Sequence, residues 1–118
     1  MKQSKARIAI TLAVLVYTAS GCAVVNRIRS KNELNEAARS YREGNYVQAE
    51  QHSRKALELD PDSKAAPLFI ARTIHAQYKP GVVAPDNVAK AREANEAYRQ
   101  ILQVDPQNDE ADLAIAFL

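Results

Sequence analysis

The chain has little of what catalytic and metal sites are built from. Its 118 residues include one cysteine, two histidines and three glycines, and no tryptophan. A single cysteine cannot form a disulfide within the chain, and neither His52 nor His75 has a cysteine or histidine at ligand spacing, which argues against a zinc site. Three glycines leave no room for a glycine-rich phosphate loop, and no nucleophile elbow is present. We therefore expect no enzymatic activity, no cofactor and no metal.

A strong charge of one sign is also missing. The formal net charge of the whole chain is +2. Three basic residues, Lys2, Lys5 and Arg7, lie ahead of an apolar run, and without residues 1–21 the chain holds 13 basic and 14 acidic residues. Proteins that bind nucleic acid present a concentrated basic face. The charge distribution therefore argues against a nucleic-acid partner.

The amino-terminal region has the pattern of a targeting segment. Residues 8–17, IAITLAVLVY, are apolar and follow the three basic residues. Ten residues are too few to span a bilayer, which takes about 20, but they fit the apolar core of a signal peptide. Small residues follow this run, and the only cysteine, Cys22, comes directly after them.

The segment Ala19-Ser20-Gly21-Cys22 resembles the lipobox of bacterial lipoproteins. The resemblance implies a signal peptide at residues 1–21, a diacylglyceryl group on the Cys22 thiol, and a tether over residues 22–30. Ala23 stands where an Asp would retain such a protein in the inner membrane, which implies the periplasmic face of the outer membrane. Two other interpretations stay open: a signal anchor over residues 8–25, or secretion with cleavage elsewhere.

A small basic cluster follows Cys22, in the predicted tether and directly after it. It consists of Arg27, Arg29 and Lys31. The cluster is either part of a solvated tether or a contact to anionic lipid headgroups.

Beyond the tether the sequence predicts helices, because alanine is frequent and glycine is rare. Ser30 and Glu33 fit a capping box, which predicts a helix start there. Gly44 predicts the end of this helix, and a second helix follows over residues 46–59 before Pro61 stops it. Two helices joined by so short a turn pack antiparallel. The expected apolar face of the first helix holds Leu34, Ala37, Ala38 and Tyr41.

The helical pattern repeats along the chain. Ala49, Leu57 and the string Leu59-Asp60-Pro61 recur 45 residues later as Ala94, Leu102 and Val104-Asp105-Pro106, while Ala37 recurs 34 residues later as Ala71. The extra 11 residues therefore form an insertion inside the second helix pair, which we place at residues 78–87. Exposed Val82 and Val83 in it either contact a partner or fold onto the helix pair. Pro67 predicts that the second opening helix either starts late, near Ala66, or is irregular at its first turn. Residues 109–118 start a third opening helix.

This repeat resembles the tetratricopeptide repeat family, whose 34-residue pattern places aromatic, glycine, alanine and proline residues at fixed positions. The first repeat matches with Tyr41, Gly44, Tyr46, Ala49, Ala56 and Pro61, and the second with Ala71, Ala94, Tyr98, Leu102 and Pro106. The resemblance covers roughly residues 31–118. It implies an all-α solenoid of antiparallel helix pairs, about two and a half repeats long, whose opening helices line a concave groove.

The resemblance also implies which residues line this groove. They are Lys31, Leu34, Ala38, Tyr41 and Arg42 from the first opening helix, Leu68, Arg72 and His75 from the second, and Leu113 and Phe117 from the last. His75 is either a groove contact or a plain surface residue. Relatives that clamp a peptide carboxylate use Lys and Asn where Leu34 and Ala38 stand, so we expect no carboxylate clamp.

Two functions follow as expectations. The first is a lipid-anchored adaptor that holds a peptide or partner protein in the groove and assists an envelope complex such as a pilus, secretin or polysaccharide exporter. The second is a self-associating structural lipoprotein, because two and a half repeats give a thin core and the last helix is unusually apolar. In that case Leu113, Ile115, Phe117 and Leu118 would pack on another copy or a partner.

Overall fold

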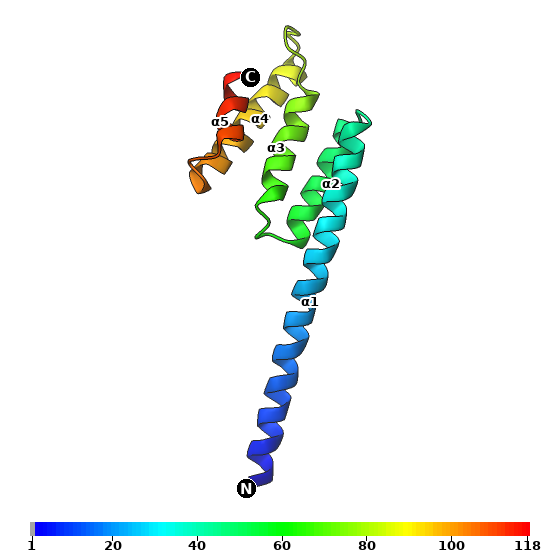
Figure 1. Ribbon diagram of the computed structural model, residues 1–118, viewed down its shortest axis with the longest axis vertical. Coiled ribbons are helices and arrows are strands. Elements are labelled where there is room, and N and C mark those ends of the chain that lie inside the picture. Colours follow the sequence, from blue (N-terminus) through cyan, green and yellow to red (C-terminus); the bar gives the residue numbers. More distant parts are fainter. Residues whose placement is uncertain (1) are drawn as a thin grey trace.

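The computed structural model describes the backbone of residues 2–118 and the side chains of residues 21–118. All of its regular elements are helices, and residues 2–118 contain no strand, which confirms the all-α prediction. The helices are α1 (Lys2–Arg42), α2 (Tyr46–Leu59), α3 (Ala65–Gln77), α4 (Pro85–Val104) and α5 (Asp109–Ala116). Figure 1 shows α2 to α5 following one another to one side of the carboxyl-terminal part of α1, whose other end extends away from them.

Each helix packs against the next along the chain, and α1 also touches α3. Alanines lie at these contacts: Ala37, Ala49, Ala71 and Ala94 are fully buried. A side chain this small lets helix backbones approach closely but buries little apolar area. The larger members of the core, Ile70, Ile74 and Tyr98, gather between α3 and α4. The result is a helical repeat-like layer whose main apolar cluster is formed by its later helices.

The repeat found in the sequence is also a repeat of backbone geometry. Asp60 ends α2 with φ −136° and ψ 87°, and Asp105 ends α4 with φ −132° and ψ 83°. In the turn after α2, the Ser63 hydroxyl accepts a 3.2 Å hydrogen bond from the Ala66 N–H. In the turn after α4, Asn108 Oδ1 accepts a 3.0 Å bond from the Ala111 N–H. In each pair the acceptor lies three residues before the N–H donor. Different side chains, Ser63 before α3 and Asn108 before α5, therefore accept a hydrogen bond from the equivalent N–H in the first turn of each helix.

The predicted helix start at Ser30 is wrong. α1 continues through this residue without a break, and Ser30 is buried at its contact with α2. Its hydroxyl donates a 2.7 Å hydrogen bond to the Ala56 carbonyl instead of capping a helix. Glu33 also faces α2, where its carboxylate lies 2.7 Å from both His52 Nδ1 and Lys55 Nζ. The backbone before Ser30 is already helical, so no free N–H groups remain there to be capped.

The predicted insertion is only partly a loop. The connection from α3 to α4 covers residues 78–84, and Pro85 opens α4, a position where proline's missing N–H costs nothing. Asp86 and Asn87, expected in the loop, lie in the first turn of this helix. Asn87 ties the loop back: its Oδ1 accepts from the Lys79 N–H at 2.8 Å, and its Nδ2 donates to the Lys79 and Val82 carbonyls. Part of the inserted length therefore extends α4.

The late start of α3 is confirmed, since the helix begins at Ala65 with Pro67 in its first turn. Within the part of the chain that the structure describes, no helix carries an apolar stretch long enough to span a bilayer. The predicted signal-peptide core, residues 8–17, lies outside the residues whose side chains are described.

Candidate binding faces

The residues predicted to line a groove occupy equivalent positions on the opening helices α1, α3 and α5. Leu34, Leu68 and Leu113 form one row at the repeat spacing, and Ala38, Arg72 and Phe117 form a second. Leu34, Leu68, Ala38 and Arg72 are half-buried. Leu113 on α5 and Phe117, which follows the last residue of α5, are 61% and 76% exposed. Lys31, Arg42 and the free thiol of Cys22, all on α1, are exposed.

A strip of three aromatic rings and one guanidinium group runs alongside these rows and includes Arg72 of the second row. It is formed by Tyr46, Tyr41, Phe69 and Arg72. The Tyr41 ring centroid lies 5.2 Å from that of Tyr46 and 6.4 Å from that of Phe69. The Arg72 guanidinium carbon lies 5.3 Å from the Phe69 ring centroid. Its Nε donates a 3.0 Å hydrogen bond to Glu110 on α5. Arg72, which we expected to be available to a ligand, is therefore already paired with a carboxylate.

His75 is half-buried against Tyr98. Its position is therefore intermediate between the two predicted for it, a groove contact and a plain surface residue. Its Nδ1 is 3.5 Å from the Tyr98 hydroxyl, and the rings meet edge to face. Burial lowers the pKa of His75 below its ordinary value, because the charged imidazolium loses hydration there. Burial likewise raises the pKa of Tyr98 to about 12, with the Glu110 carboxylate adding to the rise. His75 therefore favours its neutral form.

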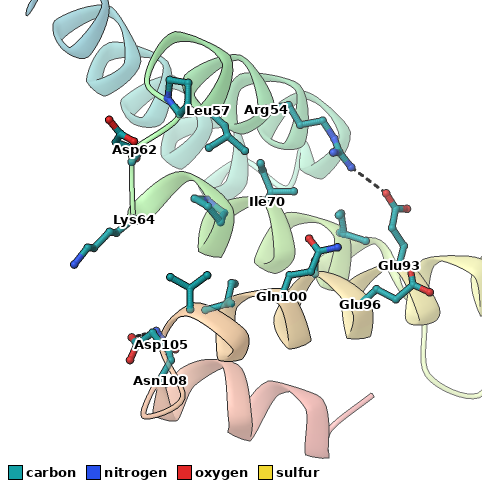
Figure 2. A pocket seen from close by; sticks show the side chains of 17 residues that line it. Arg54, Leu57, Asp62, Lys64, Ile70, Glu93, Glu96, Gln100, Asp105 and Asn108 are labelled. Atoms are coloured by element: carbon teal, nitrogen blue, oxygen red, sulfur yellow. Dashed lines mark hydrogen bonds and ion pairs between the residues drawn. The ribbon is translucent and has the colours of Figure 1, made fainter. Parts of the chain in front are cut away.

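A cleft lies on the other side of α3. Ile70 and Ile74 stand roughly 200° around the helix from Leu68 and Arg72, since an α-helix turns by about 100° per residue. They form the floor of a hollow between α2 and α4 with a volume of about 900 Å³ (Figure 2). The remaining apolar lining comes mainly from Leu57, Ala97, Ile101 and Val104. We call this hollow the α2–α4 cleft.

The rim of the α2–α4 cleft carries more carboxylates than cations. Its acidic residues are Asp62, Glu93, Glu96 and Asp105, and its basic residues are Arg54 and Lys64. One of the two cations is occupied, because Arg54 pairs with Glu93 across the cleft at 2.9 Å. Figure 2 shows Glu96 and Gln100 on the α4 side of the hollow. The rim therefore favours a positively charged ligand.

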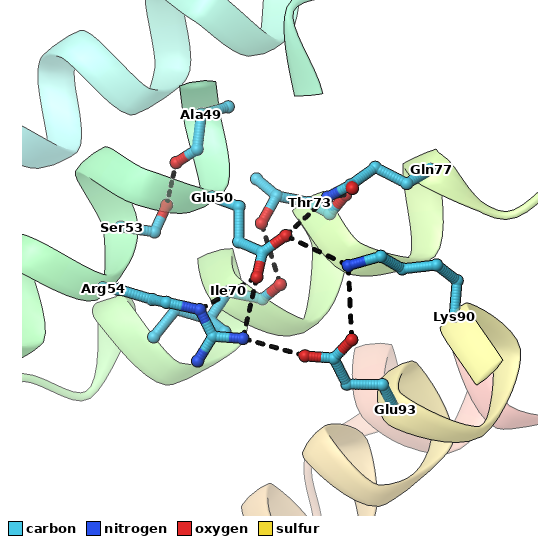
Figure 3. Close-up of polar contacts among 9 residues, drawn as sticks. All are labelled: Ala49, Glu50, Ser53, Arg54, Ile70, Thr73, Gln77, Lys90 and Glu93. Atoms are coloured by element: carbon cyan, nitrogen blue, oxygen red, sulfur yellow. Dashed lines mark hydrogen bonds and ion pairs between the residues drawn. The ribbon is translucent and has the colours of Figure 1, made fainter. Parts of the chain in front are cut away.

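A polar network closes one end of this cleft and ties α2, α3 and α4 together (Figure 3). Its centre is Glu50, whose side chain is only 13% exposed. Gln77 Nε2 donates to Glu50 at 2.6 Å, Arg54 Nε donates at 2.9 Å, and Lys90 Nζ lies 3.6 Å away. Burial alone would raise the pKa of Glu50, but these donors outweigh it and hold the pKa below its ordinary value. Glu50 is therefore a stable carboxylate.

The cleft and most of its residues were not predicted from the sequence. None of Glu50, Phe69, Glu93 and Glu96 was assigned to a binding face. The available signal was the pair of strings at residues 59–61 and 104–106, whose equivalent turns flank the cleft. Among the side chains that the structure describes, no group of three or more His, Cys, Asp or Glu residues could hold a metal ion.

No family model matches the chain, and no curated protein matches it.

Proposed function

We propose that this protein is a tetratricopeptide-like adaptor, anchored to a bacterial membrane through lipid on Cys22, that binds a segment of a partner protein. The observation that carries the proposal is the duplicated helix–turn–helix geometry, which leaves a hollow of 900 Å³ between α2 and α4. Stacked helix pairs are typical of proteins whose function is to bind other chains. The exposed thiol of Cys22 on α1 is accessible for a lipid.

The α2–α4 cleft favours a particular ligand chemistry. Its floor is aliphatic, from Leu57, Ile70 and Ile101, and its rim has an excess of carboxylates. An amphipathic helix offers a narrow apolar stripe beside its charged side chains, and such helices dock in grooves of this kind. We infer that the ligand is a helical segment of a partner protein with Lys or Arg beside its apolar stripe.

The proposed location is the periplasmic face of the outer membrane, where the partner would belong to an envelope complex such as a pilus, secretin or polysaccharide exporter. The support is the lipobox-like segment at residues 19–22. Intact mass of the membrane-extracted protein tests this part. The expected mass is that of residues 22–118 with acyl groups, and Cys22→Ser should abolish both cleavage and acylation. An unprocessed, unacylated wild-type chain would contradict the anchor.

Site-specific photocrosslinking in cells tests the binding site. A benzophenone side chain at Gln100, on the cleft, should crosslink one defined partner, whereas the same group at Arg99, outside the cleft lining, should not. Ala97→Phe, which fills the hollow, and Glu96→Lys, which reverses rim charge, should both abolish the crosslink. Ala89→Phe, an exposed position on α4, should leave it intact. Equal crosslinking from Gln100 and Arg99 would reject the cleft as the site.

Self-association is a second candidate, favoured by one observation. Leu113 on α5 and Phe117 directly after it are large, apolar and mostly exposed. An antiparallel contact between two α5 helices would cover both in each copy. Sedimentation velocity should then show a dimer that dissociates in Leu113→Ser with Phe117→Ser. A monomer at high protein concentration would reject this candidate.

A further inference from the structure

The part of α1 that follows Cys22 carries an exposed aliphatic face. Val24, Val25 and Ile28 are 56%, 53% and 56% exposed. At about 100° per residue these three side chains share an arc of about 100° on one side of the helix. Ser30, which is buried against α2, lies on the opposite side. The aliphatic face therefore points away from the helical layer.

Basic side chains border this face on both sides. The helical spacing places Arg27 and Lys31 along one edge and Arg29 along the other. None of the three forms an ion pair with any residue that the structure describes. Other basic side chains, such as those of Lys55 and Arg72, form ion pairs with carboxylates of the helical layer. No Asp or Glu precedes Glu33 in the sequence, so this part of the chain has no acidic neighbour of its own.

We propose that residues 22–32, the amphipathic segment, lie in the interface of an anionic membrane. The aliphatic face enters the boundary of the acyl chains, and the basic side chains extend along it to the headgroups. The inference rests on the proposed function, which brings the chain to a membrane through Cys22, and adds a second contact that lies in the membrane plane. Anionic lipid is the occupant because the charged side chains of the segment are all basic and border an exposed aliphatic face.

A depth profile tests this inference on the full chain. The protein has no tryptophan, so single tryptophans report their own positions. The variants are Val24→Trp and Ile28→Trp on the aliphatic face, Ala23→Trp beside them on the helix side nearer Ser30, and Val104→Trp, 88% exposed on α4, as the control. Each is reconstituted in vesicles of phosphatidylcholine mixed with phosphatidylglycerol, and quenching by brominated lipid is measured. We expect strong quenching for Val24→Trp and Ile28→Trp, and little for Ala23→Trp and Val104→Trp.

The order of these depths separates the competing outcomes. Quenching that decreases steadily from position 23 to 28 would mean that the helix leaves the membrane end-on, and this would overturn the in-plane contact. Emission of Val24→Trp that shifts to the blue in detergent without lipid, with rising protein concentration, would assign the face to a second copy and also overturn it. Vesicles that fail to carry the protein at all would reject the proposed anchor instead.

The basic residues supply a second readout. The variant Arg27→Gln/Arg29→Gln/Lys31→Gln, made in the Val24→Trp background, should lose the difference in quenching between anionic vesicles and vesicles of phosphatidylcholine alone. Electrostatic attraction amounts to about a fivefold change in partitioning for each basic residue near the surface, so three replacements remove most of the preference. The matched control, Arg92→Gln/Arg99→Gln on α4, should keep the difference. Equal behaviour of the two variants would overturn the inference.

Discussion

Ala71 and Ala116 occupy the same position in two successive opening helices, 45 residues apart, yet Ala71 is fully buried and Ala116 is exposed. Ala71 packs in one cluster with Ala94 and Tyr98 of α4, the closing helix of its pair. No closing helix follows α5 within the described residues. The two alanines therefore show how the environment of a repeat position depends on the helix that covers it.

This difference predicts the effect of enlarging each alanine. Ala71→Leu should lower the free energy of unfolding by about 1–3 kcal/mol, because the larger side chain forces α3 and α4 apart. Ala116→Leu, the matched control, should change it by less than about 0.5 kcal/mol. Urea unfolding followed by circular dichroism measures both. A loss of similar size in both variants would mean that a chain or helix also covers Ala116.

The carboxylate of Glu50 should stabilise the contact of α2 with α3 and α4. Glu50→Gln should lower the free energy of unfolding by about 1–3 kcal/mol at neutral pH, because charged hydrogen bonds to Arg54 and Gln77 are lost or weakened. Since the folded pKa of Glu50 lies below 4.5, its contribution is complete above pH 4.5 and is lost as the pH falls through the folded pKa. The difference between wild type and variant should therefore shrink in acid. Glu58→Gln, exposed on the same helix, should show no such difference.

His75 should make the stability of the protein depend on pH. Its pKa in the folded protein lies below the ordinary value of 6.5, so the unfolded chain binds the proton more readily. The free energy of unfolding should therefore fall as the pH is lowered below 6.5, down to the folded pKa. His75→Asn should flatten the profile in this window, as measured by urea unfolding at a series of pH values. Identical slopes for both proteins would show that the ring protonates equally well in the folded state.

The half-buried side chain of Asn108, which caps α5, should contribute to the stability of that helix. Asn108→Ala should destabilise α5 by about 0.5–2 kcal/mol, because the Ala111 N–H loses its acceptor. Amide hydrogen exchange at residues 109–116 should speed up, while exchange in α2 stays unchanged. Asn35→Ala, at an exposed position inside α1, serves as the control and should leave α5 unaffected. Unaltered exchange in Asn108→Ala would show that the side chain does not hold the helix start.

Two glycines should respond to alanine with opposite signs. Gly44 has a φ of +79°, a conformation in which an added Cβ costs about 1–2 kcal/mol, so Gly44→Ala should destabilise the turn between α1 and α2. Gly21 lies within α1 with open space around it, and Gly21→Ala should stabilise that helix by about 0.5–1 kcal/mol. Thermal unfolding compares the two in the Cys22→Ser background, in which the chain keeps residues 1–21. A stabilised Gly44→Ala would contradict the left-handed turn.

The sequence was sufficient for the helices and their repeat, because both depend on short-range signals. Gly44, Pro61 and the matching strings around Asp60 and Asp105 mark where helices end, and the structure has its turns there. The prediction of a helix start at Ser30 was wrong, because the same residue pattern is equally compatible with a buried serine in a continuous helix. Its actual partner, the Ala56 carbonyl, is 26 residues away.

The binding faces were harder to predict, because they depend on which long-range pairs form. Arg72 was expected to be available, but the fold places Glu110 of α5 within hydrogen-bonding reach of it. The cleft depends on the separation of α2 and α4, which is set by the packing of α3 between them and by the Glu50 network. No spacing in the sequence encodes that distance. The repeat rows were found, whereas the hollow on the other side of α3 was not.

The unbroken course of α1 from Cys22 to Arg42 has a mechanical consequence. Because this part of α1 has no hinge, the number of residues between Cys22 and the helical layer sets the direction in which the α2–α4 cleft faces relative to Cys22. Adding one residue between positions 23 and 29 would rotate the whole layer by about 100° around the helix axis and shift it along that axis by only about 1.5 Å. The length of this part of α1 therefore controls mainly the direction in which the cleft faces, and only weakly its distance from Cys22.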